Sequence, residues 1–153
     1  MTQRLNPFTA APDAIKALMA VEKAISASTL EPGLLELVRM RVSQINGCAF
    51  CLQIHLNFAR AAGVAEMRLY LLDAWRESSL YSARERAALA WAETLTSVAG
   101  HGASDADYAA MAAQFSTAEQ AMLTIAIGTI NLWNRLQIGV AATHPAAARQ
   151  AAE

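Results

Sequence analysis

The sequence of 153 residues predicts an all-α fold of six to seven helices. Apolar side chains recur every three to four residues along much of the chain, which is the period that gives a helix one buried face. No segment alternates between apolar and polar residues as a half-buried strand does, and alanine, the strongest helix former, is abundant. The length corresponds to one domain, residues 1–153, with room for a packed core.

The first two helices each begin at a proline. Residues 1–11 are expected to form an irregular arm that packs on a neighbouring subunit. Pro12 and Asp13 then begin a helix, because proline suits the first turn and an early acid suits the positive end of the helix dipole. Pro32 begins the second helix, where Glu36 lies about 100° of rotation away from the start of the apolar stripe. The apolar positions of the two helices are Ile15, Leu18, Val21 and Ile25, then Leu35, Val38, Val42 and Ile45.

A turn separates the second helix from the third. Asn46 and Gly47 form a pair that stops a helix and makes a turn, so the third helix begins at the next residue. It is predicted over residues 48–62, with Gly63 as its stop. A short helical segment follows over residues 64–75.

Three later helices share one start signal, a serine followed three residues on by an acid that caps the helix reciprocally. The pairs are Ser82 with Glu85, Ser104 with Asp107, and Ser116 with Glu119. They open helices near 83–98, 105–114 and 117–140, with a loop over 100–102 and a fraying alanine-rich tail after Pro145. Large aromatic residues assigned to the core or to a subunit contact are Trp75, Tyr81 and Trp91. Polar and aromatic residues of the last helix, assigned to a site wall or a subunit contact, are Asn131, Trp133, Asn134 and Arg135.

Composition argues against several classes of protein. Hydrophobic residues make up 55% of the chain, which is high for a small monomer and indicates apolar surface buried between subunits. The formal net charge is -1 and no basic block occurs, which argues against a nucleic-acid partner. Two cysteines do not make a secreted disulfide scaffold, and the N-terminus lacks the apolar stretch of a signal peptide. The longest uncharged run, between Glu119 and Arg135, is shorter than the ~20 residues of a membrane-spanning helix. We therefore expect a cytoplasmic protein with no membrane partner.

The chemistry-bearing residues gather between Glu36 and His55. Cys48 and Cys51 form a C-x-x-C pair, and together with His55 they occupy positions i, i+3 and i+7 of the third helix, which is a single stripe. A helix N-terminus, a paired cysteine and a neighbouring imidazole all favour the reactive thiolate, for which sulfenic acid and then disulfide are the natural next states. Folding the second helix back across the turn would bring the Glu36 carboxylate to His55, so that a third group orients the base.

Simpler interpretations exist for each of these residues. The cysteines could be buried and inert, as free cysteines often are, His55 a core histidine and Glu36 a solvated acid near Arg41. A closed zinc site is disfavoured, because three ligands along one straight helix do not make a tetrahedral set and no second C-x-x-C occurs. A c-type haem site needs a histidine where Leu52 stands, and a thioredoxin fold needs strands around the motif. No metal or cofactor is therefore expected.

The motif resembles the active-site signature of the AhpD-like alkylhydroperoxidases of the carboxymuconolactone decarboxylase superfamily. The match falls without a gap on Glu36, Cys48, Cys51 and His55. Residues 82–93 resemble the next helix of that family, and residues 131–135 a late helix of its single-domain, peroxidase-related members. The similarity spans about residues 14–140, with a motif core at about 30–100. Phe50 is a departure, because some members carry a histidine directly before the second cysteine.

The resemblance implies a thiol-dependent peroxidase that reduces small organic hydroperoxides in antioxidant defence. In this account the Cys51 thiolate attacks the O–O bond, Cys48 resolves the sulfenic acid to a disulfide, and His55, oriented by Glu36, manages the proton. A dithiol or thioredoxin-like reductant then reduces the disulfide, meeting first Cys48, which is expected to be the more exposed sulfur. The resemblance also implies a homo-oligomer, with trimers and hexamers common.

Two other functions are compatible with the sequence. The imidazole missing at Phe50 gives weight to a dithiol redox switch or disulfide-exchange protein with little peroxidase turnover. The lactone decarboxylases of the superfamily do not rely on a C-x-x-C, so the intact cysteine pair argues against that activity. The remaining histidines, His101 and His144, lie in predicted loops and have no assigned role.

Overall fold

The computed structural model describes residues 2–143, and the all-α prediction is confirmed over that range. These residues form nine α-helices and one 3-10 helix, with no strand among them. His144 and the alanine-rich tail lie outside the described residues. The α-helices are α1 (Pro7–Ala10), α2 (Pro12–Ser26), α3 (Pro32–Asn46), α4 (Ala49–Ala61), α5 (Glu66–Tyr70), α6 (Ala83–Thr96), α7 (Val98–His101), α8 (Asp105–Ala112) and α9 (Thr117–Gly139).

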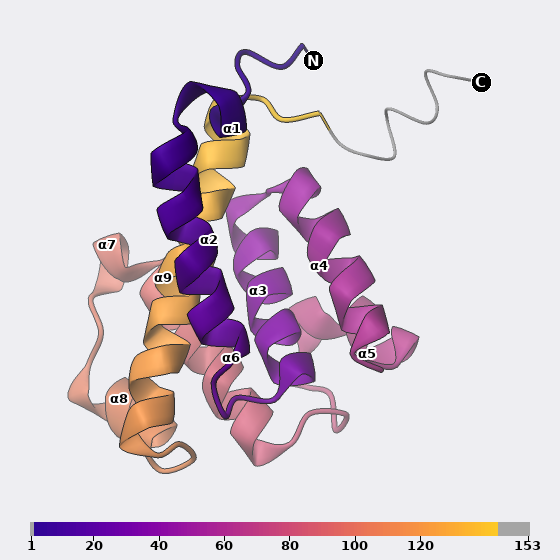
Figure 1. Cartoon of the computed structure of the whole chain (residues 1–153). Coiled ribbons are helices and arrows are strands. Elements are labelled where there is room, and N and C mark those ends of the chain that lie inside the picture. The colour runs from indigo at the N-terminus through magenta and orange to yellow at the C-terminus, as the bar shows by residue number, and fades with distance from the viewer. Residues whose placement is uncertain (1, 144–153) are drawn as a thin grey trace.

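Helix α3 lies at the centre of the fold, where it contacts α4, α6 and α9 (Figure 1). Nine of its 15 residues are buried, which is more than one apolar stripe supplies, so it is covered on several sides. Helix α2 runs beside α9 on one side of α3, and α4 packs against the other side (Figure 1). These four helices supply most of the side chains of the site described below.

Two apolar clusters that share α3 form the core. The larger one joins the predicted stripe of Leu35, Val38 and Val42 to residues of α6 and α9 that include Trp91. The smaller one joins Leu37 and Met40 of α3 to buried residues between Ala59 and Leu89. Trp75, Tyr81 and Trp91 are all buried, as the assignment to the core predicted.

The predicted helix starts are confirmed. Each serine cap is a reciprocal capping box, in which the serine oxygen accepts the N–H of the acid and the acid accepts the N–H of the serine. At the start of α6 the Glu85 nitrogen lies 3.2 Å from Ser82 Oγ, and the Ser82 nitrogen lies 2.8 Å from Glu85 Oε2. Pro12 and Pro32 stand in the first turns of α2 and α3.

The N-terminal arm differs from the prediction. Residues 7–10 form the short helix α1, capped by the side chain of Asn6, instead of an irregular chain. The arm lies against its own chain, because the Arg4 backbone N–H donates to the Val140 carbonyl at 2.9 Å and its guanidinium donates to the Gly139 carbonyl at 2.9 Å. The arm is therefore fixed at the C-terminal end of α9.

Two connecting segments also differ from the prediction. The loop expected over 100–102 contains the last residues of α7, which stops at Gly102, where φ is 68°. The segment 64–75 is divided between α5 and the 3-10 helix Leu72–Ala74. Its buried residues Leu69, Leu72 and Trp75 recur every three residues, a spacing that suits 3-10 geometry. Within residues 2–143, no helix combines the length and apolar character that crossing a bilayer requires.

Candidate active site

The turn between α3 and α4 positions the cysteine pair. Gly47 ends α3 with φ at 68°, a left-handed conformation that favours glycine. Cys48 follows as the N-cap of α4, and its sulfur accepts the backbone N–H of Cys51 at 3.3 Å. The predicted start of the third helix is thus confirmed to within a residue. Cys51 lies in the first turn of α4 and His55 one turn later.

Cys48 and Cys51 form a disulfide, with their Cα atoms 5.4 Å apart. Both residues are buried, at 2% and 4% exposure, and both belong to the larger core cluster. Cys51 lines the pocket described below, whereas Cys48 is not among its lining residues. The expectation that Cys48 is the more exposed sulfur is therefore wrong, because an N-cap side chain folds back over the first turn of its helix, here towards the core.

The packing of α3 against α4 brings Glu36 to His55. Glu36 Oε2 lies 2.7 Å from His55 Nδ1, and the two side chains are 9% and 14% exposed. Burial by itself raises the pKa of Glu36, but the hydrogen bond with His55 and the charges of His55 and Arg39 outweigh it and lower that pKa below its ordinary value. Glu36 is thus a buried, ionised acceptor and not the solvated acid of the simpler interpretation. An ionised carboxylate only accepts, so the proton of this hydrogen bond belongs to His55 Nδ1.

The interactions continue beyond Glu36 to Arg39 and Glu22, which the sequence interpretation did not select, and to Trp133, which it assigned to a site wall or a subunit contact. Arg39 lies 2.6 Å from Glu36 Oε1 through one nitrogen and 2.6 Å from Glu22 Oε2 through another. Trp133 Nε1 donates to Glu22 Oε1 at 3.1 Å. The i, i+3 spacing of Glu36 and Arg39 was a signal for the first of these contacts. No local pattern joins Trp133 to Glu22, which lies 111 positions away in the sequence.

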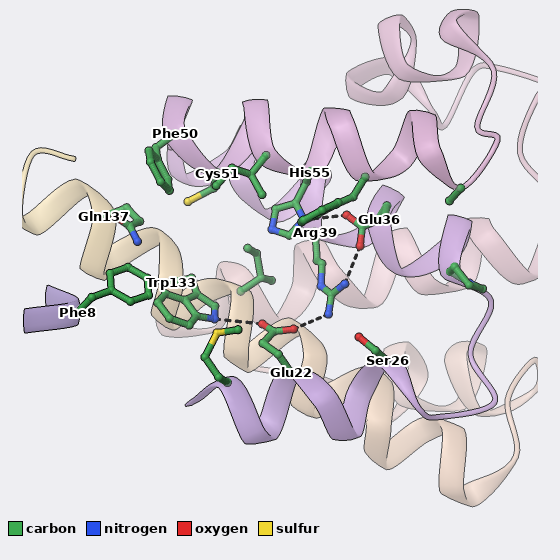
Figure 2. A pocket seen from close by; sticks show the side chains of 16 residues that line it. Phe8, Glu22, Ser26, Glu36, Arg39, Phe50, Cys51, His55, Trp133 and Gln137 are labelled. Carbon is green, nitrogen blue, oxygen red and sulfur yellow. Dashed lines mark hydrogen bonds and ion pairs between the residues drawn. The ribbon is translucent and has the colours of Figure 1, made fainter. Parts of the chain in front are cut away.

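A pocket of about 560 Å³ opens beside these groups. That volume lies within the range of small-molecule sites. Figure 2 shows Cys51, His55 and Glu36 following one another along one wall, with Glu22 and Trp133 on the facing helices. The pocket walls are largely apolar, and their aromatic residues are Phe8, Phe50, Phe58 and Trp133. Phe8 of α1 stacks on Trp133, with ring centroids 6.4 Å apart and planes at 18°.

The polar and aromatic residues singled out on α9 lie in two environments. Trp133 lines the pocket, whereas Asn131 and Asn134 are buried and both accept from the side-chain amide of Asn46, at 2.9 Å each. Asn134 also donates to Ser43 Oγ at 3.0 Å. These amides therefore tie the end of α3, next to the cysteines, to α9. Arg135 donates to the Asn131 side chain and does not line the pocket.

The arrangement suits sulfur chemistry. A cysteine faces an apolar pocket, a second cysteine lies within disulfide distance, and an imidazole one turn away is held by a buried carboxylate. Within residues 2–143 no group of three or more potential His, Cys, Asp or Glu ligands gathers around a common point. His101 is exposed at the end of α7, away from this arrangement.

Residues 12–94 match the model of the carboxymuconolactone decarboxylase family. Among curated proteins, the uncharacterized protein YdfG of Bacillus subtilis (strain 168) is 36% identical over 140 residues, which cover 92% of this chain and 95% of YdfG.

Two solved structures share the fold of this chain. ATU0492 of Agrobacterium tumefaciens, a protein of unknown function proposed to be the antioxidant defence protein AhpD, superimposes with a TM-score of 0.90 at 41% identity, over 94% of this chain and 99% of its own. A peroxidase-related protein of Ralstonia eutropha JMP134 with an alkylhydroperoxidase AhpD core has a TM-score of 0.77 at 21% identity, over 90% of this chain and 73% of its own, and at that identity shows the fold alone.

Proposed function

This chain belongs to the carboxymuconolactone decarboxylase family, with an AhpD-like fold, and we propose that it is a thiol-dependent peroxidase that reduces small organic hydroperoxides. The observation that carries the proposal is the position of Cys51. It faces a largely apolar pocket beside the His55–Glu36 pair, and Cys48 lies within disulfide distance behind it. The apolar walls suit the organic part of such a substrate.

In the proposed first step, the Cys51 thiolate attacks the terminal oxygen of the hydroperoxide. The S–O bond forms as the O–O bond breaks, so that sulfur loses two electrons and becomes a sulfenic acid. The departing alkoxide takes a proton held by His55 and leaves as an alcohol. Glu36 orients His55 by accepting its Nδ1 proton, which leaves Nε2 to exchange protons in the pocket.

In the second step, the Cys48 thiol attacks the Cys51 sulfur. The S–S bond forms, and hydroxide leaves with the thiol proton as water. An external dithiol then returns both cysteines to thiols and becomes a disulfide itself. Because Cys51 is the sulfur on the pocket side, the incoming thiol is expected to attack Cys51 and release Cys48.

A dithiol redox switch or disulfide-exchange protein is the second candidate. Phe50 favours it, because it lines the pocket directly beside Cys51 where a second imidazole would assist proton transfer. The burial of both cysteines weighs against exchange with a bulky protein partner, since an attacking thiol must reach into the pocket. The lactone decarboxylase activity has no such support, because its chemistry does not rely on a cysteine pair.

The proposal includes a homo-oligomer, trimeric or hexameric. It is supported by large apolar side chains exposed along α9, namely Ile125, Leu132 and Ile138. Sedimentation equilibrium is expected to give a mass of three or more chains, and a monomer at micromolar concentration would contradict this part of the proposal.

Steady-state turnover of cumene hydroperoxide with dithiothreitol as reductant tests the function. The wild-type protein is expected to turn over many times, and Cys51→Ser is expected to be inactive. Cys48→Ser should react once and then stall or turn over far more slowly. A wild-type protein that fails to turn over, while its disulfide still exchanges with dithiothreitol, would favour the second candidate.

A further inference from the structure

The hydrogen bonds at His55 do not end at Glu36. They continue through Arg39 to Glu22 and then to Trp133, so that one chain of contacts joins α4, α3, α2 and α9 along the pocket (Figure 2). The side chains of Arg39 and Glu22 are 8% and 22% exposed. The pair is thus largely removed from water. Its charges are therefore screened less than those of a pair on the surface.

Arg39 is shared between two carboxylates. One of its nitrogens binds the Glu36 oxygen that is not used by His55, and another binds Glu22. Without Glu22, the whole guanidinium charge would act on Glu36 and compete with His55 for that carboxylate. With Glu22 in place, the guanidinium is neutralised from its far side and its plane is fixed by two carboxylates.

We propose that Glu22 is a positioning residue of the active site, which acts through Arg39 to keep the Glu36 carboxylate available to His55. The inference deepens the proposed function, since it concerns the group assigned there to proton transfer. Trp133 extends the same role, because its indole N–H holds the second oxygen of Glu22 at 3.1 Å. Glu22 is hydrogen-bonded to Arg39 and Trp133, so Arg39 is the residue that connects it to Glu36 and His55.

The charges around Cys51 determine whether loss of Glu22 raises or lowers the fraction of Cys51 that is thiolate. Besides Cys51 itself, the charged or titratable residues that line the pocket from α2, α3 and α4 are Glu22, Glu36, Arg39 and His55, and the lining residues of α1 and α9 carry none. An imidazolium at His55 stabilises the Cys51 thiolate, and the Glu36 carboxylate stabilises that imidazolium. Without the charge of Glu22, Arg39 binds the Glu36 carboxylate more strongly. Glu36 then stabilises the His55 imidazolium less, and a smaller fraction of Cys51 is thiolate at neutral pH. Removing the charge of Arg39 has the opposite effect.

Alkylation of the reduced protein by iodoacetamide, in a Cys48→Ser background, measures the Cys51 thiolate alone. Glu22→Gln is expected to slow alkylation at neutral pH by about threefold to tenfold, because one charged contact is lost. It is also expected to lower the alkylation rate on the acidic side of the pH–rate profile. Arg39→Met is expected to speed alkylation at the same pH. The double variant Glu22→Gln with Arg39→Met is expected to return close to the parent rate, since neither charge is then present.

The matched control is Glu85→Gln on α6. Its carboxylate is 18% exposed and paired with Arg68, much as Glu22 is paired with Arg39, but it does not line the pocket. Glutamine also keeps the capping box, so the control should react like the parent. Equal rates for Glu22→Gln and the parent would overturn the inference. A double variant that is alkylated more slowly than Glu22→Gln would also overturn it. That result is expected if the Glu22–Arg39 ion pair only supports the fold, because removing the second charge would then restore nothing. The assay needs no hydroperoxide, so it can succeed even if the peroxidase proposal fails.

Discussion

His55 Nδ1 lies 2.7 Å from Glu36 Oε2, although the two residues stand on different helices and 19 positions apart. Their contact depends on the tight turn at Gly47, which folds α4 back along α3. Because the carboxylate is buried and ionised, it fixes the proton of the imidazole on Nδ1 and turns the other ring nitrogen to the pocket. The orientation of His55 is therefore set by α3 and not by α4 alone.

Replacement of Glu36 by glutamine tests this relationship. The amide keeps the shape of the side chain but removes the charge that stabilises an imidazolium. A hydrogen bond to a charged group contributes about 1.5–3 kcal/mol, so alkylation of Cys51 at neutral pH should slow by about tenfold or more. Glu85→Gln serves as the control. Unchanged alkylation kinetics in Glu36→Gln would show that the charge of Glu36 does not activate Cys51.

The stacked pair of Phe8 and Trp133 predicts a dependence on substrate size. Phe8 is 52% exposed and forms part of the pocket wall only because α1 lies against the end of α9. Phe8→Ala removes an aromatic contact of about 0.5–1.5 kcal/mol, so KM for cumene hydroperoxide should rise about twofold to tenfold. The KM for hydrogen peroxide should not change, because that molecule has no organic group to contact Phe8.

Met67→Ala is the control for this variant, since Met67 is 59% exposed on α5 and does not line the pocket. Equal changes of KM for both peroxides in Phe8→Ala would show that Phe8 supports the fold and not the recognition of the organic group.

The amide cluster between α3 and α9 predicts a loss of stability without a loss of chemistry. Asn134 is fully buried, accepts from Asn46 and donates to Ser43. Asn134→Ala leaves Ser43 without that donor and should lower the free energy of unfolding by about 1–3 kcal/mol. Urea denaturation measures this, with the exposed Asn57→Ala on α4 as the control. A variant as stable as the parent would show that water replaces the lost amide.

Acid stability should depend on Glu119. Its hydrogen bond from Arg84, followed by that from the Ser116 backbone, lowers the pKa of Glu119 to about 2 from an ordinary value of 4.5. A depressed pKa means that the unfolded chain takes up the proton first as the pH falls. The stabilisation is therefore complete above pH 4.5 and is lost progressively towards pH 2.

Glu119→Gln should accordingly flatten the dependence of unfolding free energy on pH in that window, while glutamine retains the capping box. Urea denaturation at a series of acidic pH values measures the slope, with the exposed Glu77→Gln as the control. An unchanged slope would mean that Glu119 titrates alike in the folded and unfolded chains.

The features that sequence predicted best are those with local causes. Serine caps, the proline starts and the Gly47 turn each depend on residues within four positions of one another, and all are found as predicted. The short distance from Glu36 to His55 also followed from a helical hairpin with a defined turn. These predictions succeeded because the backbone geometry is set by the same few residues that signal it.

The features that sequence did not predict depend on how distant helices pack. The attachment of the N-terminal arm to α9 needs Arg4 to meet Gly139, which lies 135 positions away. The link from Arg39 through Glu22 to Trp133 needs α2, α3 and α9 to converge, and no periodicity within one helix encodes that. The burial of Cys48 was missed for the same reason, since the helices that cover it are assembled from the whole chain.

The central claim is that Cys51 is oxidised by a hydroperoxide and is then resolved by Cys48. Its most direct test is the intact mass of the fully reduced protein, followed in time after one equivalent of cumene hydroperoxide, with Cys48→Ser in parallel. The account predicts rapid loss of two hydrogens in the wild type and one added oxygen on Cys51 in the variant. Slow or absent oxidation of the wild type, or an oxygen found on a residue other than Cys51 in the variant, would contradict it.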